Sequence, residues 1–220
     1  MAVEAVVFDF DGLMMDTEGT MLASWQHEWR WHGLELDTST FFAEHAGDVS
    51  EHRYAALAAA VGPAYDQAAS HARRLAHRDE LNAALDLLPG IADWLAQARR
   101  LGLRLAVATS SPRGWASRHL ADRGSLAAFE FLACGDEVAR PKPDPGVYRL
   151  ALERLGLSAG RVVAVEDSPH GVAAAQAAGL RCVAIPNSHA DAGLFASADL
   201  LLSSAADRPL DGVLRALEPG

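Results

Sequence analysis

Four short apolar segments constrain the fold of this chain most strongly. They span residues 5–10, 103–110, 161–167 and 181–186. Their apolar residues are nearly continuous rather than alternating, which is typical of strands buried on both faces of a parallel sheet. Two weaker segments, 129–135 and 198–204, are further strand candidates.

Helical segments follow these predicted strands. Residues 90–102, 145–156 and 168–179 each end at a glycine, as a left-handed helix cap requires. The alternation of strand and helix predicts an α/β fold with a doubly wound parallel sheet.

One long segment interrupts that alternation after the first strand. About 70 residues follow without a clear strand pattern, and they predict helices over 20–33, 39–47, 50–62 and 64–88. Pro89 and Gly90 mark the return to the alternating pattern. We therefore expect an α/β catalytic core formed by residues 1–17 and 88–220, with an inserted α-helical cap domain over 18–87.

Charge and hydropathy limit the classes of partner. The formal net charge of −10 argues against nucleic-acid binding, and no segment has the roughly 18 apolar residues that a membrane helix needs. The N-terminal segment is too short and too acidic for a signal peptide. We expect a cytoplasmic monomer that binds neither nucleic acid nor membrane, with Cys134 and Cys182 as buried free thiols.

Acidic residues stand where the predicted strands end. Asp9 and Asp11 end the first, and Glu166 and Asp167 end the third of the four strong segments. The carboxyl ends of parallel strands meet at one edge of the sheet, so these carboxylates should converge. An oxygen-only set suits Mg²⁺. Asp167 or Ser168 could instead cap the helix that begins near Pro169, but capping does not explain an acid at the end of a buried strand.

Three further residues fit a phosphate site at the same edge. Thr109 and Ser110 end the second segment, and Lys142 lies in the loop before the 145–156 helix. Taken singly, Thr109 could be a turn residue and Lys142 a solvated loop residue. Together, hydroxyls, backbone N–H groups and an ammonium can hold phosphoryl oxygens, and this conjunction favours phosphate binding.

These residues, in this order, resemble the motifs of the haloacid dehalogenase superfamily of aspartate-nucleophile hydrolases. FDFDGLMMDTE (8–18) is similar to its first motif, Thr109 to its second, Lys142 to its third and VEDSPHGVAAAQAAG (165–179) to its fourth. The helical insert resembles the cap of the subgroup that includes sugar phosphatases, phosphoglycolate phosphatases and β-phosphoglucomutase.

The resemblance implies roles for the acids. Asp9 would attack phosphorus and form an aspartyl-phosphate, and Asp11 would act as general acid and base. Asp9, Asp11 through its backbone carbonyl, and Asp167 would hold Mg²⁺, with Glu166 as a further metal-site residue.

It also implies how the phosphoryl group is bound. Thr109, Lys142 and the backbone N–H groups near Gly12 and Ser110 would stabilise its charge. The cap should select the substrate, expected to be a small phosphorylated metabolite such as a sugar phosphate. Candidates for contact with that substrate are His45, Asp48 and Arg113.

Two alternative functions remain open at this stage. A β-phosphoglucomutase-like mutase would have a His where Met21 stands and cations near Ala46 and Ser50, so hydrolysis is the favoured reaction. A receiver-like phosphoacceptor switch also gathers Asp, Thr or Ser, and Lys around Mg²⁺. However, receiver domains are shorter, have no cap and carry their Asp on a middle strand.

Overall fold

The computed structural model describes residues 2–42 and 50–218, which form two compact units. The first comprises Met1–Asp16 with Asp86–Gly220, and the second comprises Thr17–Leu85. The sequence placed the corresponding boundaries after residue 17 and before residue 88.

The first unit is built on a six-stranded sheet in the order β3-β2-β1-β4-β5-β6. All pairings are parallel, and β1 lies between β2 and β4, with Phe8 opposite Val107 and Val165. The strands are β1 (Ala5–Phe8), β2 (Arg104–Ala108), β3 (Phe131–Ala133), β4 (Val162–Glu166), β5 (Arg181–Ala184) and β6 (Leu200–Leu201). The predicted doubly wound parallel sheet is confirmed.

Every predicted strand segment contains a strand, but the strands are shorter than the segments. β1 ends at Phe8, two residues before the end of its apolar run, and β2 ends at Ala108. The first residues beyond these ends, Asp9 and Thr109, still donate backbone hydrogen bonds to the neighbouring strands and carry polar side chains.

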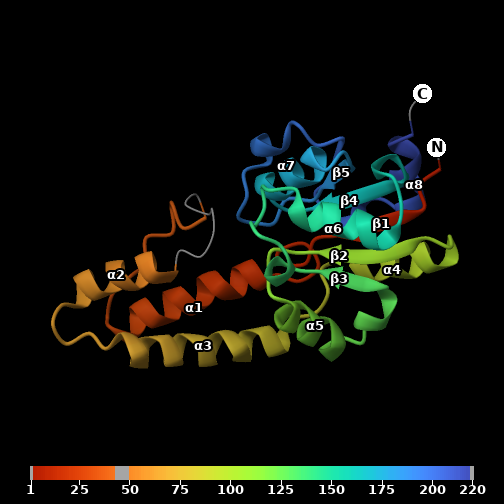
Figure 1. Cartoon of the computed structure of the whole chain (residues 1–220). Coiled ribbons are helices and arrows are strands. Elements are labelled where there is room, and N and C mark those ends of the chain that lie inside the picture. The colour runs from red at the N-terminus through yellow and green to blue at the C-terminus, as the bar shows by residue number, and fades with distance from the viewer. Residues whose placement is uncertain (1, 43–49, 219–220) are drawn as a thin grey trace. The chain divides into compact units, whose positions relative to one another are not determined.

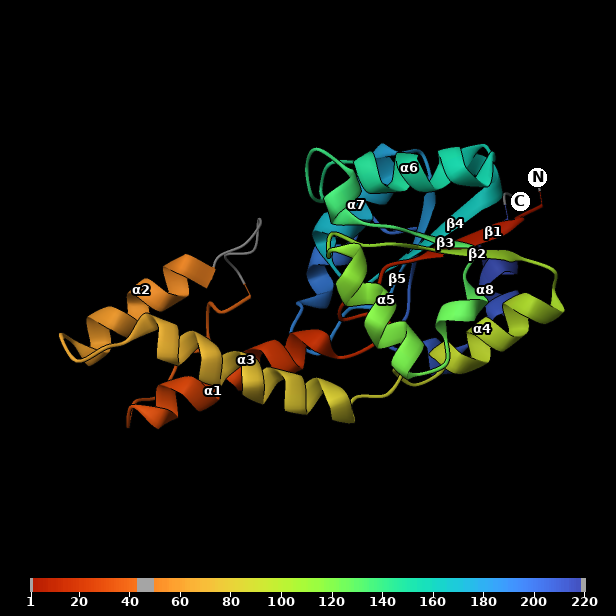
Figure 2. The ribbon, with the colours of Figure 1, turned by 60° about the horizontal axis from the view of Figure 1, so that its bottom comes forward.

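Helices cover both faces of the sheet (Figure 1, Figure 2). One face is covered by α6 (Gly146–Leu155) and α7 (Pro169–Ala177), and the other by α4 (Ile91–Arg100), α5 (Arg113–Asp122) and α8 (Leu210–Ala216). On the α6 side Val7 packs in a cluster with Tyr148. On the α4 side Phe8 meets the Trp94 ring edge-on, with centroids 6.5 Å apart. Large buried side chains on both faces hold β1 rigidly at the centre of the sheet.

The described residues of the inserted unit form α1 (Thr17–Trp31), α2 (Ser50–Val61) and α3 (Gln67–Ala84). Its core packs Trp25 against Tyr54, with ring centroids 4.7 Å apart, and places the Arg74 guanidinium 4.5 Å from the Trp25 ring. The helix expected over 39–47 is not found in its described part, because residues 39–42 form turns and the rest lies outside the described residues. Helix α3 ends at Ala84, before the expected residue 88, since Leu85 adopts an extended conformation.

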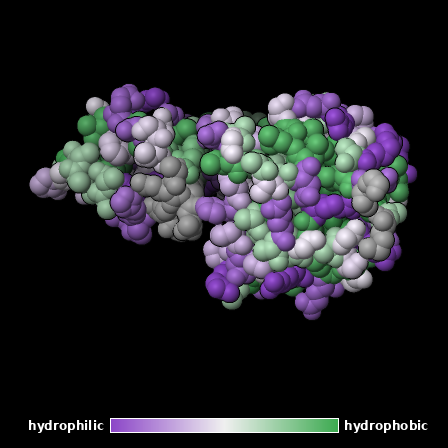
Figure 3. Space-filling model, turned by 90° about the horizontal axis from the view of Figure 1, so that it is seen from above, coloured by the Kyte–Doolittle hydropathy of each residue, from purple (hydrophilic) through white to green (hydrophobic). Residues whose placement is uncertain are grey.

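In the part of the chain that the structure describes, no helix is both long and apolar enough to cross a membrane. Hydrophilic and hydrophobic residues are interspersed over each unit on the face shown in Figure 3. Cys134 and Cys182 are buried free thiols, as predicted.

Candidate active site

Asp9 lies directly beyond the central strand β1 and is almost fully buried, with 6% exposure. Its N–H donates to the Val165 carbonyl at 2.9 Å, which fixes the backbone against β4. Burial raises the pKa of Asp9 well above its ordinary value; the charges of Glu166 and Asp11 act in the same direction, and Lys142 opposes them. A carboxylate in this position needs added positive charge to serve as a nucleophile near neutral pH.

Lys142 places a positive charge beside Asp9 and Glu166. Its Nζ donates to the Asp9 carboxylate, to Glu166 Oε1 at 2.6 Å and to the Ala108 carbonyl at 2.9 Å. Burial would lower the pKa of Lys142, but the two carboxylates outweigh burial and raise it above its ordinary value. The lysine is therefore a permanent positive charge that fixes the rotation of Asp9.

Glu166, at the end of β4, is fully buried behind Lys142. Its Oε1 also accepts from the Tyr148 hydroxyl at 2.5 Å, while its Oε2 accepts from the Asp167 N–H at 3.3 Å. A Cβ on Gly171 would lie 1.9 Å from Glu166 Oε2, so only glycine leaves space for this carboxylate beside α7. Tyr148 was not among the predicted site residues.

Asp167 completes the acidic group at this edge. Its carboxylate is 4% exposed, and Oδ2 accepts from Asn187 Nδ2 at 2.7 Å. The Asn187 Oδ1 accepts the His189 N–H at 2.9 Å, which orients the amide with its Nδ2 toward Asp167. A cavity of about 400 Å³, lined in part by Gly12, Asp16 and Asn187, opens beside this pair.

The buried acids fit a divalent cation. Ligand oxygens of Asp9, Glu166 and Asp167 lie within 4.8 Å of one another, and all three residues are buried. Lys142 contributes one positive charge beside these three carboxylates, and buried carboxylates are stabilised by further positive charge. Hard oxygen donors with excess negative charge match the preference of Mg²⁺.

Asp11 lies two residues beyond Asp9 and is held by side chains from the β2–α5 segment. Its Oδ2 accepts from the Ser111 hydroxyl at 2.6 Å and from the Thr109 hydroxyl at 3.4 Å. Its Oδ1 accepts from the Trp115 indole N–H at 2.8 Å. The structure thus brings Asp11 and Thr109 together, as predicted from their strand ends. Ser111 and Trp115 are additional contacts that the sequence did not indicate.

The loop after β2 is itself fixed by close backbone packing. Ser110 Oγ accepts the Lys142 N–H at 3.3 Å, and the Gly135 N–H donates to the Ser111 carbonyl at 3.0 Å. A Cβ on Gly135 would lie 1.9 Å from the Ser110 carbonyl oxygen. Ser110 therefore links the loops that carry Thr109 and Lys142.

Gly12, expected near the phosphoryl group, and Arg113, expected to contact the substrate, make other contacts in the structure. The Gly12 N–H donates to the Met15 carbonyl at 2.9 Å, and Gly12 has φ of 77°, so this residue makes a tight turn after Asp11. The Arg113 guanidinium donates to the Leu132 carbonyl at 2.6 Å and to Glu137 at 2.7 Å, so these contacts direct it to β3. His45 and Asp48 lie outside the described residues.

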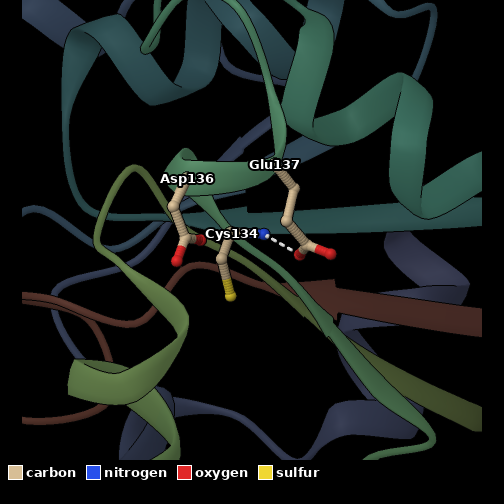
Figure 4. Close-up of side chains that lie close together, drawn as sticks. All are labelled: Cys134, Asp136 and Glu137. Carbon is tan, nitrogen blue, oxygen red and sulfur yellow. Dashed lines mark hydrogen bonds between the residues drawn. The ribbon is translucent and has the colours of Figure 1, made fainter.

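A second acidic cluster, formed by Cys134, Asp136 and Glu137, follows β3 (Figure 4). Glu137 accepts from Arg154 at 2.6 Å, from Arg113 at 2.7 Å and from the Cys134 N–H at 3.0 Å. The hydrogen bond from Arg154 is the main cause that lowers the pKa of Glu137 to about 2. Burial raises the pKa of the Cys134 thiol to about 11. This cluster is compensated by arginines and has no thiolate to offer, so it has the properties of a structural element.

The site around Asp9 is therefore typical of a class of α/β enzymes. These enzymes place an aspartate beyond the first strand, with a lysine and further acids around it. Residues 6–185 match the family of haloacid dehalogenase-like hydrolases. The chain belongs to this family, and the prediction of an enzyme of this family is confirmed.

Named relatives cover nearly the whole chain. Protein CbbY of Cereibacter sphaeroides is 37% identical over 219 residues, which cover 93% of this chain and 94% of CbbY. The phosphorylated carbohydrates phosphatase of Thermotoga maritima is 32% identical over 181 residues, which cover 81% and 82% of the two chains. A crystal structure of a CbbY mutant from Rhodobacter sphaeroides in complex with xylulose-(1,5)bisphosphate is 33% identical, with a TM-score of 0.75 over 96% of this chain and 98% of that one.

Proposed function

We propose that this protein is a Mg²⁺-dependent phosphatase of small phosphorylated sugars that acts through an aspartyl-phosphate on Asp9. The observation that carries the proposal is the position of Asp9, buried beyond the central strand against Lys142 and within 4.8 Å of ligand oxygens of Glu166 and Asp167. The sugar phosphate is proposed from the names of the relatives, one of which acts on phosphorylated carbohydrates.

The first half of the reaction transfers the phosphoryl group to the protein. An Asp9 carboxylate oxygen attacks phosphorus, the bond from phosphorus to the ester oxygen breaks, and the ester oxygen keeps the electron pair. Asp11 donates a proton to that oxygen, and the alcohol leaves. Lys142 and the Thr109 hydroxyl stabilise negative charge on the phosphoryl oxygens.

The second half regenerates the enzyme. A water molecule attacks the phosphorus of the aspartyl-phosphate while Asp11, now a carboxylate, takes its proton. The bond between phosphorus and the Asp9 oxygen breaks and inorganic phosphate is released.

The proposed metal ligands are Asp9, Asp167 and the backbone carbonyl of Asp11. When bound there, Mg²⁺ would neutralise carboxylate charge and polarise the phosphoryl group. Both Glu166 oxygens accept hydrogen bonds from protein donors, among them Lys142 and Tyr148, so we assign Glu166 to orienting Lys142 beside the metal.

Phosphate release from a panel of phosphorylated sugars, with and without Mg²⁺, tests the proposal. Wild-type protein should release phosphate only with Mg²⁺, and Asp9→Asn should lower turnover at least about 1,000-fold while remaining folded. Turnover retained by Asp9→Asn would reject the nucleophile. Isomerised sugar phosphate in place of free phosphate would indicate a mutase.

A further inference from the structure

The contacts of Asp11 are different on its two carboxylate oxygens. Oδ1 accepts from the indole N–H of Trp115, on α5, at 2.8 Å. Oδ2 accepts from the hydroxyls of Ser111 at 2.6 Å and Thr109 at 3.4 Å. These three partners belong to the same unit as Asp11.

The chemistry of these donors separates the two oxygens. An indole N–H can only donate, and a carboxyl oxygen accepts a hydrogen bond better when it carries no proton, so the bond to Trp115 disfavours a proton on Oδ1. A hydroxyl can donate or accept, so Ser111 can turn and accept a hydrogen bond from a protonated Oδ2. Oδ2 is also the oxygen that faces Thr109, which our mechanism places on the phosphoryl group.

We propose that Trp115 is a positioning residue for proton transfer: it holds Oδ1 of Asp11 and makes Oδ2 the oxygen that carries the proton. The proposal rests on the proposed function, because it assigns a role only if Asp11 is the general acid and base. In the first half-reaction the Oδ2 proton passes to the ester oxygen; in the second, Oδ2 takes a proton back from water.

The ring of Trp115 is fixed in place by its neighbours. His119 lies one helical turn further along α5, and its ring is edge-on to the indole of Trp115, with ring centroids 4.3 Å apart. The His119 ring is also stacked against Phe10, with ring centroids 6.2 Å apart. Burial is the main cause that lowers the pKa of His119, so a neutral imidazole supports the indole. Phe10 lies between Asp9 and Asp11 in the chain, which ties the position of Trp115 to the backbone of the site.

A series of substituted phenyl phosphates with leaving groups of graded basicity tests this assignment. A general acid matters most when the leaving group is a strong base and least for p-nitrophenolate. Trp115→Phe keeps a ring but removes the N–H. It should lower kcat/KM about 10- to 100-fold for the most basic leaving group, and less than about 3-fold for p-nitrophenyl phosphate. The plot of log kcat/KM against leaving-group pKa should therefore become steeper.

Trp94→Phe is the matched control. Trp94 is buried in α4 and its indole N–H donates to the Arg208 carbonyl at 2.9 Å, so this variant also loses a buried indole hydrogen bond. Its plot should stay parallel to that of the wild type. In an Asp11→Asn background, Trp115→Phe should no longer change the slope, because the group that it positions is absent.

The outcomes separate this proposal from the proposed function. If the wild type hydrolyses none of the phenyl phosphates with Mg²⁺, the proposed function fails. If the wild type is active and Trp115→Phe lowers kcat/KM equally for every leaving group, Trp115 is only structural and the inference is overturned. Should Trp115→Phe not fold, Ser111→Ala carries the test, because it removes the hydroxyl that can accept a hydrogen bond from protonated Oδ2 and should steepen the plot in the same way. A parallel plot for Ser111→Ala would then overturn the inference.

Discussion

Two groups of acidic side chains lie at the carboxyl edge of the same sheet, and they differ in charge balance. The Asp9–Glu166–Asp167 group is buried and has Lys142 as its cation. The Cys134–Asp136–Glu137 group is more exposed, and Arg113 and Arg154 both pair with Glu137. Proximity of acidic residues is therefore not enough to predict a metal site, whereas several buried carboxylates beside Lys142 favour one.

Among substitutions outside the proposed nucleophile, the largest effect should come from the residue that makes space for Glu166. Gly171→Ala places a Cβ 1.9 Å from Glu166 Oε2. Glu166 is held by Lys142 and Tyr148 and cannot move freely. We expect an activity loss of about 100-fold, because small displacements of catalytic groups have effects of this size. Overpacking should also destabilise the protein by about 1–3 kcal/mol.

Gly114→Ala is the control for this substitution. A Cβ on Gly114, in the first turn of α5, meets nothing within 4 Å. Activity and thermal stability should stay close to those of the wild type. Equal losses in both glycine variants, measured by phosphate release and thermal unfolding, would show that the Glu166 contact is not the cause.

A smaller effect should follow from removing the amide beside Asp167. Asn187→Ala should raise the Mg²⁺ concentration for half-maximal activity about 10-fold, because groups that orient metal ligands have effects of this size. Activity at saturating Mg²⁺ should largely recover. Gln97→Ala removes another side-chain amide of the same unit, which accepts the Leu210 N–H, and should leave the Mg²⁺ dependence unchanged. An unchanged Mg²⁺ requirement in Asn187→Ala would show that Asn187 does not orient Asp167 for metal binding.

The smallest effect on activity is expected in the second cluster. Glu137→Gln should leave activity and Mg²⁺ dependence unchanged but lower the free energy of unfolding by about 1–2 kcal/mol, through loss of charged hydrogen bonds. Because the folded-state pKa of Glu137 is lowered to about 2, its stabilisation is complete above its ordinary pKa and is lost as the pH falls toward 2. The stability difference between wild type and variant should therefore shrink from pH 5 to pH 2 in urea titrations. A stability difference that stays constant over this pH range would contradict an ionic origin of the stabilisation by Glu137.

The sequence predicted the sheet and the acids of the site for one physical reason. Continuous apolar runs identify strands buried on both faces, and polar residues at their ends must gather at one edge. Asp9, Thr109 and Glu166 were found in this way. The fold class could be predicted because six strand segments and three helical segments alternate as they do in a doubly wound α/β fold.

Other residues of the site could not be found by that reasoning. Tyr148 and Trp115 lie within helices, where the apolar pattern shows which face is buried but not which side chain reaches a carboxylate. Arg113 was expected in the cleft because it is near Thr109 in sequence. Its guanidinium instead pairs with Glu137, a partner 24 residues away that local pattern cannot reveal.

Calorimetric titration of Mg²⁺ into the wild type, Asp167→Asn and Glu137→Gln tests the central claim most directly. The buried, under-compensated carboxylates should bind one Mg²⁺ in the wild type and in Glu137→Gln with similar affinity, and Asp167→Asn should lose at least about 10-fold in affinity. Absence of Mg²⁺ binding to the wild type, or an equal loss in Glu137→Gln, would contradict the account.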